Sequence, residues 1–98
     1  MLLNYTYTDA QVARAEEMIP SMSYTALLDN LIWLSDLGVL APGNPVSMLV
    51  VARLVDRTRL RRSGVTRQRI EAALEAYRVS GSAVVAVVKA LEQAIATV

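Results

Sequence analysis

The chain of 98 residues contains no cysteine and no histidine, and these two absences exclude most of the chemistry that small proteins perform. Without cysteine there is no disulfide framework and no thiolate nucleophile. Without histidine the commonest general base is missing, and the two absences together remove the usual ligands of zinc sites. The sequence therefore predicts no metal site and no cofactor.

Carboxylates are also too scattered to suggest an acid and base pair. The closest pairs, Glu16 with Glu17 and Glu71 with Glu75, fall at positions typical of exposed helix faces. We expect Glu71 and Glu75 to pair with Arg67 and Arg78 at helical spacing. With no base to activate a serine, the sequence predicts that the protein is not an enzyme.

Long hydrophobic runs are missing as well, although hydrophobic residues make up 54% of the chain. The apolar stretch 82–88 is followed by Lys89 and Glu92, well short of the ~20 residues that a membrane span needs. Residues 1–7 lack the basic region and apolar core of a signal peptide. We therefore expect one small domain, residues 1–98, in the cytoplasm and without contact to a membrane.

Apolar residues recur at helical spacing, and no hairpin turn or glycine-rich phosphate loop interrupts them. In segment 66–81, for example, Ile70, Ala73, Leu74 and Tyr77 share one helix face. The predicted fold is all-α, with about five to six antiparallel helices that form a HEAT-like helical-repeat unit. The residues that we expect to cap these helices are Thr8, Ser23, Asn44, Asp56, Thr66 and Ser82.

Segment 46–55 is the least certain element in type, because its valines would also suit a strand. Asn44 and Pro45 form a cap and first-turn pair, which favours a helix. Apart from Ser47 and Arg53 every residue of the segment is apolar, so we expect this helix to be buried on several sides.

Positive charge is concentrated in segment 53–69, which we call the arginine belt. It holds seven of the nine arginines and one acid, Asp56, while the rest of the chain is acidic and the whole carries a net charge of +1. A concentrated positive field attracts polyanions, above all a phosphate backbone. The alternative is a solvated surface with no ligand.

Five blocks in the middle of the chain resemble the TROVE module of the Ro autoantigen family in order and spacing. They are YTALLDNL at 24–31, LGVL at 37–40, ARL at 52–54, LRRSGV at 60–65 and ALEAYRVSG at 73–81. The resemblance covers about 24–96, and it implies a miniature Ro-like protein that lacks the von Willebrand factor A-type domain. Ro proteins are rings of helical repeats that bind small non-coding Y RNAs and misfolded RNAs.

The resemblance also implies an RNA-contacting loop at 62–67, where the family has a basic residue, Ser, any residue, Ile, His and Pro. Thr66 stands in the place of the RNA-binding histidine and Arg67 in the place of the proline. Arginine grips phosphate in a fork and stacks on bases, so Arg67 is the candidate for the lost contact. The predicted RNA-binding residues are Arg53, Arg57, Arg61, Arg62, Thr66 and Arg67.

Two alternative functions remain open on the sequence alone. Residues 63–70 are similar to the turn and recognition helix of a helix-turn-helix DNA reader, although arginines fill most of the segment where its apolar first helix would lie. The chain would otherwise be a helical scaffold that binds protein, with arginines that serve solubility.

The excess of apolar residues further predicts self-association. A stack of helical pairs has two open ends, and unlike ends that meet head to tail give a ring or a filament. Because Ro proteins are rings, we expect a homo-oligomeric ring with its joints at the buried third helix or the last helix.

Overall fold

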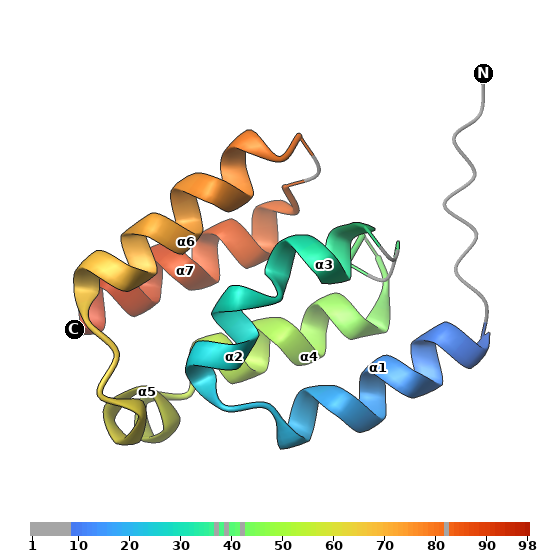
Figure 1. Ribbon diagram of the computed structural model, residues 1–98, viewed down its shortest axis with the longest axis horizontal. Coiled ribbons are helices and arrows are strands. Elements are labelled where there is room, and N and C mark those ends of the chain that lie inside the picture. Colours follow the sequence, from blue (N-terminus) through green and yellow to red (C-terminus); the bar gives the residue numbers. More distant parts are fainter. Residues whose placement is uncertain (1–8, 37, 39, 42, 82) are drawn as a thin grey trace.

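The computed structural model describes residues 9–36, 38, 40, 41, 43–81 and 83–98, and in this part of the chain the protein is all-α with no strand (Figure 1). The seven helices are α1 Asp9–Ser21, α2 Tyr24–Asp29, α3 Leu31–Asp36, α4 Pro45–Leu54, α5 Arg57–Ser63, α6 Arg67–Val79 and α7 Val85–Thr97.

The described residues contain one more helix than the upper estimate from the sequence, because the leucine-rich segment that follows the Ser23 cap is divided at Asn30. The backbone N–H of Asn30 bonds to the carbonyls of Ala26 and Leu27, and its side-chain Nδ2 donates to Ala26 O at 2.7 Å. Asparagine side chains compete in this way for backbone partners and favour helix ends. The division leaves α2 and α3 as two helices of six residues each.

Side-chain caps fix four of the helix starts as the sequence predicted. The oxygens of Ser23, Asn44, Asp56 and Thr66 accept from backbone N–H groups at 2.9 to 3.2 Å. Thr8 and Ser82 lie outside the described residues, and α7 starts after Val84 without a side-chain cap bond. Each cap satisfies one of the N–H groups that a helix start leaves unpaired.

The core lies where α7 packs against both α6 and α4, and α4 in turn packs against α1. Figure 1 shows α6 and α7 side by side in antiparallel directions, with α2 and α3 in front of α4. Residues 46–54 of segment 46–55 are helical as expected, and Val55 is the C-cap. The burial of this helix is one-sided, however: Val46, Val50 and Leu54 are fully buried while Met48 is 62% exposed.

Two buried tyrosines tie the helices together through their hydroxyls. Tyr24 donates to the carbonyl of Leu54 at 2.6 Å and so joins the start of α2 to the end of α4. The hydroxyl of Tyr77 accepts from the N–H of Val84 at 2.9 Å and joins α6 to the start of α7. The Tyr24 bond holds the end of α4 in place immediately before the chain enters α5.

Candidate nucleic-acid interface

The arginine belt occupies one end of the molecule, where Figure 1 places α5 and the start of α6. Leu60 is the buried residue of α5 and anchors this short helix, while Val65 is buried in the turn that follows. Gly64 has φ of 66°, a left-handed conformation that residues with a Cβ avoid. The turn brings the arginines of α5 next to those that begin α6.

Four of the arginines in the belt are exposed and form no ion pair with any described residue. They are Arg57, Arg61, Arg62 and Arg67. A fifth, Arg53, lies in the last turn of α4, where it is partly buried and also without an ion pair. The structure thus brings four predicted arginines to one exposed end and leaves Arg53 half-buried behind them.

The other two arginines of the belt, Arg59 and Arg69, and Arg78 outside it lie close to acids. Arg69 Nη2 lies 2.8 Å from Asp29 of α2, and Arg59 Nε lies 3.9 Å from Asp56. Arg78 bonds to Glu92 of α7 at 2.8 Å. The charge of the belt is therefore reduced at Arg59 and Arg69 and unopposed at the four exposed positions.

The expected pairing of Glu71 and Glu75 with Arg67 and Arg78 is wrong. Because α7 lies alongside α6, it brings Glu92 within reach of Arg78. At the start of α6, Arg67 precedes Glu71 by four residues. An ion pair on a helix is stronger when the acid comes first, so this order is the less favourable one. Both glutamates are exposed, and Arg67 forms no ion pair with any described residue.

The belt also places cations where helices disfavour them. The first turns of α5 and α6 contain arginines and no acid. A helix start carries partial positive charge, so each exposed cation there costs roughly 0.3–1 kcal/mol at low salt. An anion bound at this end of the molecule would relieve that repulsion.

Thr66 contributes to the same surface in a structural role. Its Oγ1 accepts from the backbone N–H of Arg69 at 3.2 Å and caps α6, while the side chain stays exposed. The hydroxyl hydrogen is still available to donate, because a hydroxyl both donates and accepts.

A polar recess of about 530 Å³ opens between the start of α2 and α5, beside the belt. Its lining residues are Ser23, Tyr24, Asp56, Thr58, Arg59, Arg62 and Ser63. Of these, only Arg62 was a predicted site residue. The contact between α2 and α5 that forms the recess is a tertiary one, and the sequence carries no local signal for Ser23 or Thr58 as part of it.

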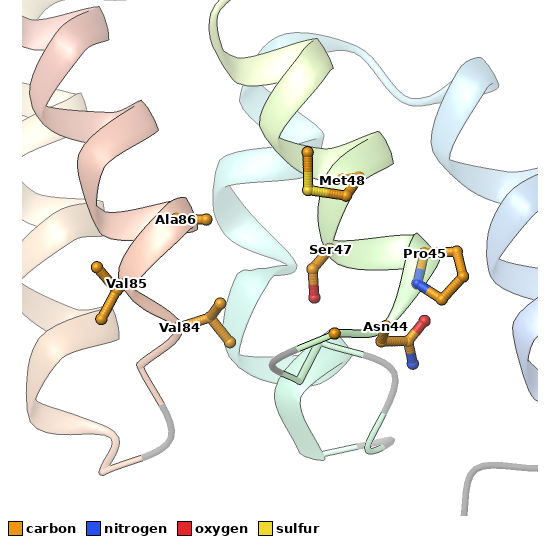
Figure 2. Close-up of a pocket in the computed structure, with 8 residues that line it drawn as sticks. Asn44, Pro45, Ser47, Met48, Val84, Val85 and Ala86 are labelled. Atoms are coloured by element: carbon orange, nitrogen blue, oxygen red, sulfur yellow. The ribbon is translucent and has the colours of Figure 1, made fainter.

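A second, apolar groove of about 560 Å³ lies between the starts of α4 and α7, at the opposite end of the molecule from α5 (Figures 1 and 2). Met48 and Val85 face this groove and are 62% and 68% exposed. Asn44 lies at its edge; its Oδ1 caps α4, while its buried Nδ2 has no hydrogen-bond partner among the described residues.

Among the residues that the structure describes, no group of three or more acids is placed to hold a metal ion. No described helix combines the length and the apolar character needed to cross a membrane. The chain matches no protein-family model, no curated protein and no solved structure.

Proposed function

We propose that the chain is a non-catalytic RNA-binding module that grips the phosphate backbone through the arginine belt. The observation that carries this proposal is the cluster of four exposed arginines without ion pairs at one end of the molecule. Arg69 and Arg78, in contrast, form ion pairs with Asp29 and Glu92. Arg57 and Arg67 lie in the first turns of α5 and α6, and Arg61 and Arg62 lie in the last turn of α5. Exposed arginines without an ion pair have the charge and the donors that phosphates need.

RNA is favoured over duplex DNA by the surface that follows the belt. Glu71 and Glu75 are exposed along α6, directly after Arg67 and Gln68 in its first turn. A recognition helix lying in a major groove would bring these carboxylates towards phosphates on either side. Single-stranded or looped RNA can reach the arginines without following the acidic part of α6.

The resemblance to Ro proteins extends this proposal to a HEAT-like repeat and to small non-coding, Y-like or misfolded RNA. The antiparallel packing of α6 on α7 supports such a helical pair. Thr66 in place of the family's histidine is a specific departure within the proposed loop, and Arg67 supplies a second cation there. The cytoplasm is the compartment that this function suggests.

The helix-turn-helix reading remains a second candidate because of one observation. Helices α5 and α6 are joined by only three residues, 64–66, and Arg67 and Gln68 are exposed at the start of α6. That is the arrangement in which a helix-turn-helix protein presents side chains to bases. Duplex DNA is therefore the competitor that an experiment must include.

A competition experiment separates the candidates. Fluorescence anisotropy would follow a labelled, structured RNA on the protein, with unlabelled RNA or duplex DNA added. The proposal expects RNA to compete at lower concentration than DNA. Stronger competition by duplex DNA would favour the helix-turn-helix function, and no binding to either would favour a protein-binding scaffold. Sequencing of the nucleic acid that copurifies with the protein would then identify the RNA.

A pair of matched variants tests whether the belt makes the contact. Arg61→Ala with Arg62→Ala removes two positive charges from the belt. Arg14→Ala with Lys89→Ala removes two exposed positive charges elsewhere. Losing two phosphate contacts should lower the slope of log affinity against log salt by about 1.4. The Arg14 and Lys89 double variant should keep the salt slope of the unmodified protein. If the two double variants change the slope equally, the proposed interface is contradicted.

Self-association belongs to the same proposal, and the exposed apolar side chains at the groove of Met48 and Val85 support it. The ring expected from the resemblance requires this groove to meet a different surface of the next copy. The opposite end of the molecule carries the exposed arginines, so the surface favours two grooves that meet about a two-fold axis.

A further inference from the structure

We propose that the recess between the start of α2 and α5 holds one phosphodiester of the bound RNA, with Arg62 and Thr58 as its specific ligands. The inference rests on the proposed function and deepens it, because it distinguishes one built phosphate site from the diffuse attraction of the belt. The recess is the place where the belt meets another helix, so a phosphate there has protein on more than one side.

Charge in the recess suits a monoanion. Arg59 and Arg62 contribute two positive charges and Asp56 one negative charge, which leaves a surplus of one. The acid is itself occupied: Asp56 Oδ1 accepts from the N–H of Arg59 at 3.1 Å, and Oδ2 lies 3.9 Å from Arg59 Nε. A phosphodiester carries a single negative charge and would balance the surplus.

The same recess is lined by donors that have no partner among the described residues. Arg62 is exposed and forms no ion pair, and the hydroxyl of Thr58 makes no hydrogen bond to any described residue. Arg59 has one of its five N–H groups directed at Met22 O, at 3.5 Å, so others stay available. Ser63, in contrast, is fully engaged with Leu60 O and Val65 N.

Hydrogen bonds hold several lining residues of the recess in place, unlike the side chains of a mobile surface cluster. Tyr24 is buried at its base and bonds to Leu54 O at 2.6 Å. Ser23 caps α2 through the N–H of Ala26, and Arg59 links α5 to the chain before α2. Arg59, the donor fixed in this way, loses less conformational freedom when a phosphate binds than a free side chain would.

Arginine-to-lysine substitutions test the site without changing net charge. Arg62→Lys keeps the cation and loses the planar fork that binds two oxygens at once. Arg14→Lys is the matched control, since Arg14 is exposed on α1, lies outside the belt and does not line the recess. We expect Arg62→Lys to weaken binding of a single-stranded oligouridylate by about five- to tenfold, with little effect from Arg14→Lys.

Thr58→Val provides an independent test, because it removes only the hydroxyl from an exposed position. Its effect should be a loss of about two- to fivefold in affinity with an unchanged salt slope, the sign of a lost neutral donor. Amide chemical shifts recorded by NMR with the dinucleotide UpU, which has one phosphodiester, should move most around Thr58 and Arg62.

The outcomes separate the two proposals. If Arg62→Lys and Arg14→Lys have equal effects and Thr58→Val has none, the belt binds RNA by charge alone and the specific site is wrong. If the unmodified protein binds no oligouridylate at low salt, the RNA-binding function fails with it. Urea unfolding of each variant checks that its fold is retained, so a loss of affinity reports on the site.

Discussion

Tyr24 is a buried side chain whose hydroxyl bonds to the end of α4, just before the chain enters α5. This hydroxyl is sensitive to alkaline pH. Burial raises the pKa of Tyr24 to about 12, and burial is also the main cause that raises the pKa of Tyr77. In the unfolded chain a tyrosine ionises near pH ~10. The stability due to each neutral hydroxyl is therefore complete below that pH and is lost as the pH rises towards the folded pKa.

We predict that Tyr24→Phe lowers the free energy of unfolding by about 1 kcal/mol at neutral pH, because the bond to Leu54 O is lost. Above pH ~10 the unmodified protein should lose up to roughly 1.4 kcal/mol per pH unit for each buried tyrosine. Tyr24→Phe should lose less stability over the same pH range, because it has one buried tyrosine fewer. Urea unfolding across this pH range measures both effects, with Tyr77→Phe as the second buried tyrosine for comparison; an identical pH slope in all three proteins would contradict the argument.

Thr66 combines two roles that substitution can separate. Replacement by histidine restores the residue of the Ro pattern and should strengthen binding to a Y-type RNA, if this loop docks as in Ro proteins. The same change removes the cap of α6, at a cost of about 0.5–2 kcal/mol. Thr66→Ser keeps a capping hydroxyl and Thr66→Ala loses it without adding an imidazole.

Filter binding and urea unfolding of the three Thr66 variants assign the effects. The histidine and alanine variants should unfold at similar urea concentrations, and only the histidine variant should gain affinity. If histidine and alanine variants bind alike, the chain contacts RNA through another surface.

At the scale of single residues, sequence analysis was most successful where the controlling interaction is local. Four of the six expected caps are confirmed, since a cap depends on a side chain and an N–H two or three residues away. The partners of Arg69 and Arg78 were missed because Asp29 and Glu92 come from other helices. The same reason explains why Ser23 and Thr58 were not expected near Arg62.

At the scale of elements, the turn between α5 and α6 decides how the belt is presented. Gly64 has φ of 66° and an added Cβ would meet nothing within 4 Å, so the cost of Gly64→Ala is conformational. Gly81, with φ of 81° and equally open space, is a matched position between α6 and α7. Both alanine variants should lose about 1 kcal/mol of stability.

Only Gly64→Ala should also weaken RNA binding, because it lies between the arginines of α5 and Arg67. Thermal unfolding gives the stability of each variant and anisotropy gives its affinity. Equal affinities for the two glycine variants would show that the geometry of this turn is unimportant for binding.

Prediction of whole helices depended on which pattern dominated each segment. The regular apolar face of Ile70, Leu74 and Tyr77 was enough to predict α6, and all three are buried. In contrast, the leucines of segment 27–34 continue the helical pattern across the position where α2 ends and α3 begins. Asn30 divides that segment through its own bond to Ala26 O, which a hydrophobic pattern does not reveal.

At the scale of the whole molecule, surfaces of opposite character lie at its two ends. The exposed arginines lie around α5, and the apolar groove with Met48 and Val85 lies at the starts of α4 and α7 (Figures 1 and 2). An excess of apolar residues was evident in the sequence. That Met48 and Val85 line one groove was not, because this results from the packing of α4 beside α7.

This polarity makes the oligomeric state testable through one substitution. Met48→Lys places a charge in the apolar groove and should abolish self-association without unfolding the protein, since Met48 is already 62% exposed. Ile32→Lys is the control, because Ile32 is 40% exposed and lines a different recess beside α6. Light scattering coupled to size exclusion gives the mass of each particle.

Two grooves that meet about a two-fold axis predict twice the 10.7 kDa of one chain. Three or more copies would instead favour the head-to-tail ring that the Ro resemblance implies. In both assemblies several belts act together, so RNA affinity should rise with association. Met48→Lys should then lower affinity for a long RNA more than for a short oligouridylate that reaches only one belt. A clean monomer of the unmodified chain at micromolar concentration would rule out both assemblies and leave each belt to bind RNA alone.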